Sequence, residues 1–145
     1  MVRKPGSLTV VVEPDHSIGI RVARLRLIFK VSEVYERALF GDDSPGALAF
    51  VEWFTLPPRQ TDPVNGMHMV TRCRNVQGEP ECAIVELVDV RRACHLMPKF
   101  GRQDVARAIT SESILDNFDD FFLNKWIDKD MYRSMYWNEA ESDDE

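Results

Sequence analysis

Short β-type segments, interrupted by proline and glycine turns, divide the chain and constrain its fold more than any other feature. These segments are rich in β-branched and aromatic residues and cover Leu8–Val12, Ile20–Phe29, Ala47–Phe54, Met67–Cys73, Cys82–Val90 and Phe118–Ile127. Proline cannot donate a hydrogen bond to a sheet, so the segments cannot be extended far. Because 145 residues suit one domain, the sequence predicts a mainly β fold: a small bent sheet or partly open barrel of about six strands, spanning residues 1–137.

One short helix is predicted at the C-terminal end of this domain. Met131 and Met135 stand one helical turn apart within Asp128–Trp137, and Asp128 is a residue type that caps helix N-termini. Residues 138–145 follow as an acidic tail that holds Glu139, Glu141, Asp143, Asp144 and Glu145. With high charge and no apolar anchor, this tail is expected to be flexible.

Three other segments are less clearly patterned. Val31–Phe40 is ambiguous between helix and strand, and Val34, Leu39 and Phe40 are expected in the core. Residues 93–100 either continue the preceding strand or bend away from it. Residues 101–117 are polar and predict a long loop with at most one helical turn.

The β-type segments also carry expectations about exposure. In Ile20–Phe29, apolar and polar residues alternate with a slip at Ala23-Arg24, which indicates a bulged, half-buried strand with its arginines facing away from the core. Leu8–Val12 is expected to be an exposed edge strand, which offers a route to a homodimer.

Charge argues against non-specific nucleic-acid binding driven by net charge. The chain has 18 basic and 24 acidic residues, for a net charge of −6, whereas such domains are usually strongly basic. Two stretches, residues 21–37 and 91–107, are nevertheless locally basic. An alternative function is therefore a nucleic-acid-binding module or a patch for an acidic partner, with candidate residues Arg21, Arg24, Arg26, Arg91, Arg92 and Arg102.

The sequence offers little support for metal or catalytic chemistry. Cys73, Cys82 and Cys94 form none of the close pairs that zinc sites use, so no metal or cofactor is expected. Three sparse cysteines fit a reducing, intracellular compartment. There is no apolar run long enough to cross a membrane, and no phosphate-binding glycine motif.

A Cys-His hydrolase is kept as a remote alternative. Adjacent residues on a strand point to opposite faces, so Cys94 and His95 make a poor catalytic pair by themselves. We expect Cys94 to be buried and unreactive, and His95 to bond a backbone group or the carboxylate of Asp128 or Asp130.

Aromatic residues provide the binding candidates. Trp53, Trp126 and Tyr132 lie near predicted segment ends and could line a cage for a methylated lysine, held by cation–π attraction. The alternative is that these side chains pack in the core. Trp53 in particular is expected to be largely buried, because it lies inside an aromatic strand that Pro57 ends.

Four segments in order resemble the bromo-adjacent homology domain: VARLRLIF at 22–29, FVEWFTLP at 50–57, IVELVDVRRAC at 84–94 and FFLNKWI at 121–127. The resemblance covers about residues 20–130, and Trp53-Phe54 followed by Pro57 is its most specific part. It implies a bent β-barrel that acts as a chromatin-linked interaction module, with Trp53 at the position of a cage tryptophan. Arg59 departs from the acidic residue of cage-bearing members and would repel a cationic ligand.

The chain is also similar to an uncharacterised family encoded in or beside transposons of mushroom-forming fungi. The similarity rests on VEWF at 51–54, DVRRACHLMPKF at 89–100 and FLNKWIDKDMY at 122–132. Together the two resemblances imply a fungal, nuclear, non-enzymatic module. Its expected partner is a protein, such as a histone tail or a transposon-encoded protein.

Overall fold

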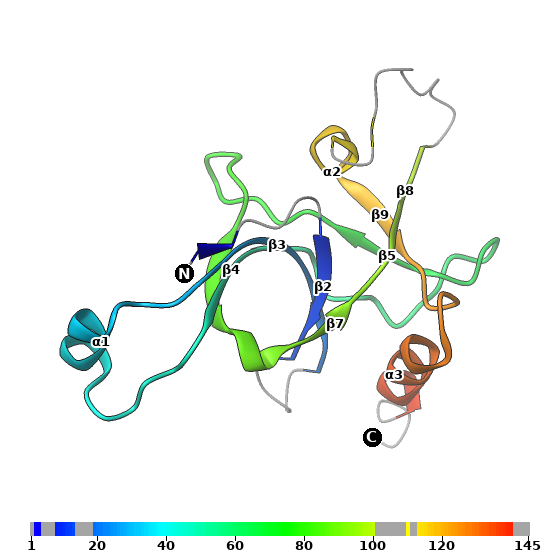
Figure 1. Ribbon diagram of the computed structural model, residues 1–145. Helices are drawn as coiled ribbons and strands as arrows, with labels where there is room; N and C mark the ends of the chain where they lie inside the picture. Colours follow the sequence, from blue (N-terminus) through cyan, green and yellow to red (C-terminus); the bar gives the residue numbers. More distant parts are fainter. Residues whose placement is uncertain (1, 4–7, 14–18, 101–109, 111–112, 141–145) are drawn as a thin grey trace.

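A computed structural model describes residues 2–3, 8–13, 19–100, 110 and 113–140. Strands account for 40% and helices for 19% of the structure. The prediction of a mainly β fold is therefore confirmed. Figure 1 shows the arrangement, in which a strongly curved sheet stands beside a smaller one.

The larger sheet forms a partly open barrel. Its antiparallel strands follow the order β6-β4-β3-β2-β7, and a short strand, β1, also pairs with β3. The bounds are β1 Val2–Arg3, β2 Leu8–Val12, β3 Arg21–Phe29, β4 Leu48–Trp53, β6 Cys82–Glu86 and β7 Val90–Ala93. The two edge strands, β6 and β7, are joined only by a 3₁₀ turn over Leu87–Asp89, so the sheet curls round on itself without closing.

The smaller sheet has three antiparallel strands in the order β5-β9-β8. They are β5 (His68–Thr71), β9 (Asp120–Leu123) and β8 (Leu96–Pro98). Since β8 follows β7 after two residues, one stretch of chain runs directly from the barrel into the smaller sheet.

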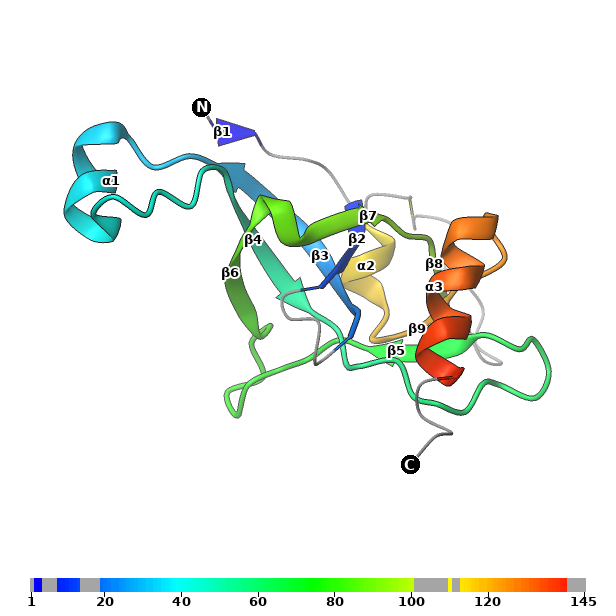
Figure 2. The same cartoon turned by 90° about the horizontal axis from the view of Figure 1, so that it is seen from below.

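Three short helices complete the described fold: α1 (Glu33–Phe40), α2 (Ile114–Asn117) and α3 (Lys129–Ala140). Helix α3 confirms the predicted C-terminal helix and includes residues 138–140 of the predicted tail, whereas 141–145 lie outside the described residues. Figure 2 shows α1 extending from the barrel on the side away from α3.

Two hydrophobic cores lie on opposite faces of β2 and of the first half of β3. One core fills the barrel and consists of Val10, Val12, Ala23, Leu25, Ala49, Val51 and Trp53. The second lies between the barrel wall and the smaller sheet and consists of Val11, Val22, Phe54, Val70, Leu96, Leu115, Phe121, Leu123, Met131 and Met135. Successive residues of a strand point to opposite faces, so β2 and the first half of β3 contribute side chains to both cores, and residues 9–12 and 22–25 are buried.

Three expectations about exposure were wrong. Strand β2 is central, because it pairs with both β3 and β7, so it offers no edge for a homodimer. Arg24 is only 5% exposed, because α2 lies over the face of β3 that was expected to meet solvent. Val34, Leu39 and Phe40 are exposed, and no residue of α1 is buried, so this helix contributes to neither core.

Some boundaries also differ from the prediction. The segment Cys82–Val90 is two strands, since the 3₁₀ turn interrupts it and β7 joins the opposite edge of the sheet. The predicted bulge exists, but the register shift lies between Leu25 and Leu27 rather than at Ala23-Arg24. The described residues hold nine strands rather than about six, partly because of such splitting.

Candidate functional site

A fork in the sheets creates the candidate site. At Cys94 the chain is still bonded to β2: its N–H donates to the Thr9 carbonyl at 2.9 Å, and the Thr9 hydroxyl donates to the Cys94 carbonyl at 2.8 Å. One residue later the chain changes partner, and the N–H of Asn124 donates to the His95 carbonyl at 3.0 Å. From this point β8 runs with β9 and diverges from β2.

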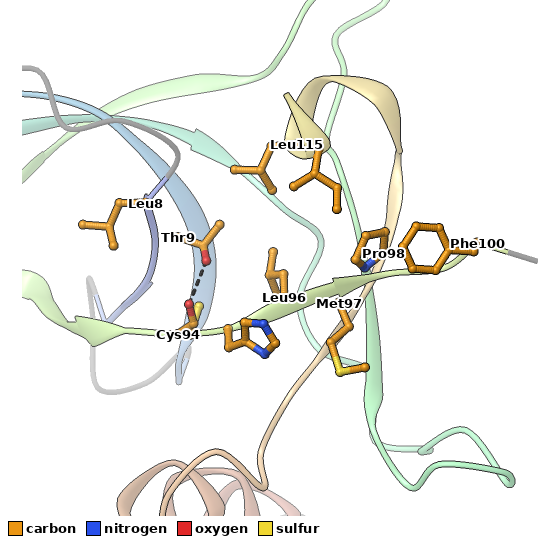
Figure 3. A pocket seen from close by; sticks show the side chains of 10 residues that line it. Leu8, Thr9, Cys94, Leu96, Met97, Pro98, Phe100 and Leu115 are labelled. Atoms are coloured by element: carbon orange, nitrogen blue, oxygen red, sulfur yellow. Dashed lines mark hydrogen bonds between the residues drawn. The ribbon is translucent and has the colours of Figure 1, made fainter. Parts of the chain in front are cut away.

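The fork holds a pocket of about 470 Å³. Strand β2, the stretch from Cys94 through β8 and helix α2 supply its walls, as the close-up in Figure 3 shows. Most of its lining is apolar, from Leu8, Leu96, Met97, Pro98, Phe100, Ile114 and Leu115. Thr9, Cys94 and His95 supply the polar groups.

Two arginines fix the helical wall of the pocket. The Nη1 atom of Arg24, on β3, lies 2.7 Å from Oδ1 of Asp116 on α2. The Nη1 atom of Arg72, just after β5, donates to the Leu115 carbonyl at 2.8 Å. A helix of four residues cannot hold itself in place, so these contacts position Ile114 and Leu115 at the pocket.

The contact between Arg24 and Asp116 predicts a pH-dependent stability. The hydrogen bond from Arg24 lowers the pKa of Asp116 below its ordinary value of 3.8. A carboxylate with a lowered folded-state pKa stabilises the fold above the ordinary value, and this contribution is lost as pH falls through the folded-state pKa. We expect Asp116→Asn to melt at a lower temperature than the wild type at pH 7, and the gap to narrow below pH 3.8.

Thermal melts of both proteins between neutral and acidic pH would check this expectation. Asp42→Asn is a suitable control, because Asp42 is exposed in the turn after α1. A gap for Asp116→Asn that does not change with pH would contradict the assigned role of the ion pair.

Cys94 lies half-buried at the pocket and packs against the second core. Burial raises the pKa of its thiol to about 11. Only about one molecule in ten thousand would carry the reactive thiolate at pH 7. Native-state alkylation with iodoacetamide should therefore modify exposed Cys82 well before Cys94. Rapid modification of Cys94 would contradict this structural role.

His95 has a different partner from the one expected. His95 is exposed, and its ring Nδ1 lies 3.2 Å from Nδ2 of Asn124, the residue that directly follows β9. Asp128 instead binds Arg92 of β7 and accepts the Met131 N–H at 2.8 Å, so that it caps α3. The expectation that His95 bonds a backbone group or the carboxylate of Asp128 or Asp130 was wrong, because its ring contacts the Asn124 side chain and Asp128 binds Arg92. The barrel is still tied to α3, through Arg92 and not through His95.

Among the described residues, no cysteine is hydrogen-bonded to a histidine. The Sγ atom of Cys73 accepts from Nη2 of Arg21 at 3.5 Å, and the thiol of Cys82 donates to the Pro80 carbonyl at 3.3 Å. His68 is buried, with Nδ1 2.6 Å from the Pro58 carbonyl.

The three aromatic candidates do not lie together. Trp53 is only 9% exposed, as expected, and the guanidinium carbon of Arg21 lies 4.5 Å from the centre of its ring. Trp126 and Tyr132 are exposed and form a tilted pair with ring centres 5.3 Å apart. The Nζ atom of Lys125 lies 5.2 Å from the Trp126 ring. Trp53 therefore serves the barrel core, and an arginine already covers its ring.

The basic candidates are engaged in contacts within the protein. Arg26 lies 3.6 Å from Glu52, and Arg91 lies 3.1 Å from Glu13. Arg24 and Arg92 bind Asp116 and Asp128, as described above, while Arg21 donates from Nε to the Phe54 carbonyl at 3.0 Å. Arg102 lies outside the described residues.

Sequence reasoning missed the pocket itself. Its walls come from three segments far apart in the chain, and each of these apolar stretches has an ordinary explanation as strand or loop. Leu96-Met97-Pro98 and Ile114-Leu115 could have drawn attention as apolar runs beside polar tracts. Only the change of strand partner at Cys94 brings them together.

Within the described ranges, no cluster of His, Cys, Asp or Glu side chains could hold a metal ion. None of the helices described is both long and apolar enough to cross a membrane. Comparison with protein-family models, with curated proteins and with solved structures found no match to this chain.

Proposed function

We propose that this protein is a non-enzymatic interaction module that binds a partner protein by taking an extended apolar segment of it into the pocket of the fork. The observation that carries the proposal is the pocket of about 470 Å³, which is lined mainly by apolar side chains and opens between two diverging strands. Concave, mostly apolar sites with a few polar groups are typical ligand sites.

The chemistry of the polar groups supports binding rather than catalysis. The Cys94 thiol has a raised pKa because of its burial, whereas a nucleophilic cysteine needs a lowered one. The Thr9 hydroxyl is already used to bond the Cys94 carbonyl. These groups therefore shape the pocket and do not activate a nucleophile in it.

Binding of nucleic acid is the weaker proposal. Phosphate recognition requires arginine and lysine side chains that are free to meet the backbone. Arg24, Arg26, Arg91 and Arg92 each lie against a carboxylate instead. An extended protein segment suits the apolar pocket better than a phosphate backbone does.

The nature of the partner is proposed from the sequence resemblance alone. A bromo-adjacent homology-like module of fungal transposon origin would meet a histone tail or a transposon-encoded protein in the nucleus. The pocket adds a requirement to this proposal, because the segment bound must contain at least one apolar side chain.

A peptide selection tests the proposal. A phage-displayed library of random peptides is selected on the folded protein, and the enriched peptides are synthesised and their affinities measured. We expect an apolar consensus. Ile114→Glu and Leu8→Glu place a charge on two different pocket walls, and each should weaken binding about tenfold or more, because a charge is costly to bury without a partner.

Ile84→Glu is the matched control, because Ile84 is an exposed isoleucine on β6. It should leave affinity unchanged. The proposal fails if no peptide is enriched, or if the pocket variants bind as well as the control. A third outcome also contradicts the proposal: the protein is a dimer by light scattering, and Ile114→Glu makes it a monomer. In that case the occupant of the pocket is a second copy of this chain.

A further inference from the structure

Strand β8 has one paired edge and one edge that faces the fork. Its paired edge follows from two bonds: the N–H of Asn124 to the His95 carbonyl at 3.0 Å, and the N–H of Lys99 to the Asp120 carbonyl at 2.9 Å. In an antiparallel ladder, alternate residues bond to the same neighbour. His95, Met97 and Lys99 thus direct their main-chain groups to β9, and Leu96 and Pro98 direct theirs the other way.

The other edge of β8 lies on the side where Cys94, just before β8, bonds to Thr9 of β2. Cys94 has the same orientation as Leu96 and Pro98, and it pairs with Thr9. Beyond Cys94 the ladder stops, because β2 and β8 diverge. Among the described residues, the Leu96 N–H and the carbonyls of Leu96 and Pro98 have no main-chain partner.

We infer that the partner segment binds by strand addition, as an extended backbone that continues along β8 the ladder that ends at Thr9 and Cys94. This inference rests on the proposed function and names how the pocket recognises its ligand. An unpaired strand edge is a template for another extended chain, and recognition through main-chain bonds with side-chain pockets beside them is an established mode of peptide binding.

The geometry fixes which ligand groups must take part. The Leu96 carbonyl and the Pro98 carbonyl each accept one ligand N–H, and the Leu96 N–H donates to one ligand carbonyl. Because Leu96 and Pro98 are two residues apart, the two required ligand N–H groups are also two residues apart, whether the added strand is parallel or antiparallel. The N–H of the ligand residue between them points away from β8.

Pro98 makes the edge selective in one respect. Proline has no N–H, so a ligand carbonyl opposite Pro98 finds no donor from the main chain. The ligand therefore receives one donor and two acceptors from β8. An apolar ligand side chain beside this ladder would meet Leu8, Ile114 and Leu115, which line the same pocket.

The test is a scan of backbone N-methylation in a peptide selected on this protein. Each methyl group removes one N–H without changing the side chain. We expect two positions, separated by one insensitive residue, at which methylation weakens binding about tenfold or more. Amide hydrogen exchange followed by NMR should also show that the Leu96 N–H becomes protected when peptide is added, while Met97, already directed to β9, serves as the internal control.

The outcomes separate this inference from the proposed function. Alternating sensitivity with new protection at Leu96 supports strand addition. Peptide binding that Ile114→Glu abolishes but that methylation leaves unchanged at every position overturns strand addition and leaves the proposed function standing. If no selected peptide depends on Ile114, the proposed function fails, and strand addition at this pocket fails with it.

Discussion

Replacing Trp53 with alanine is expected to lower the free energy of unfolding by about 3–5 kcal/mol, the range for a large aromatic side chain removed from a packed core. Trp53 is only 9% exposed and packs with Val10, Leu25 and Val51 inside the barrel. The guanidinium of Arg21 also loses the ring on which it stacks. Denaturant unfolding of the variant, followed by circular dichroism, would measure the loss.

Trp126→Ala is the matched control, because Trp126 is 57% exposed. Substitutions at exposed positions usually change stability by less than about 0.5 kcal/mol, although Trp126 also contacts Tyr132. A Trp53→Ala protein that is as stable as Trp126→Ala would show that Trp53 does not serve the barrel core. That result would favour a surface role for its ring, such as a cage.

Replacing Phe121 with alanine is expected to have a similarly large effect, again about 3–5 kcal/mol. Phe121 is fully buried in the second core, and its ring lies edge-on to Phe54 at 5.7 Å between centres. This pair joins the smaller sheet to the end of the barrel strand β4. The loss should therefore loosen the smaller sheet from the barrel and not only weaken β9.

Phe122→Ala tests the direction of the side chains on β9. Phe122 is the next residue and faces away from the second core, where it pairs with Met69 and Met97. We expect a clearly smaller loss of stability, because this side chain is only half-buried. Equal losses for Phe121→Ala and Phe122→Ala, measured by the same denaturant unfolding, would contradict the two-core arrangement.

The elements with a local signal could be predicted from the sequence. Asp128 caps α3, and Met131 and Met135 are buried one turn apart, because a capping residue and helical spacing act within a few residues. Trp53 is buried in a strand that ends before Pro57 for an equally local reason. These features depend little on contacts with distant segments of the chain.

Features that depend on distant segments could not be predicted in this way. Arg24 alternates with apolar neighbours like any solvent-facing residue of a strand, and only α2, more than ninety residues later, covers it. The composition of β2 suits an edge strand and a central strand equally well. It is a central strand because β7, from a distant part of the chain, pairs with its second edge. Helix α1 has apolar residues at helical spacing, yet the fold holds it away from both cores.

The pocket belongs to this second group of features. It exists because β7 and β8 are consecutive in the chain but belong to different sheets. No residue type near Cys94 and His95 indicates that the chain changes its neighbouring strand from β2 to β9 at this point. The candidate cage and the basic patch follow from residue type, position in the sequence and, for Trp53, the family resemblance. None of these shows that Arg21 covers Trp53 or that Asp116 binds Arg24.

The most direct measurement of the central claim is a methyl NMR titration of the isotope-labelled protein with a selected peptide. Ile114 lines the pocket, whereas Ile84 lies exposed on β6 and lines no part of it. If the pocket receives the partner segment, the methyl signals of Ile114 and Leu8 shift and saturate together, and those of Ile84 do not move. A saturating shift at Ile84 with none at Ile114 or Leu8 would place binding elsewhere and contradict the proposed function.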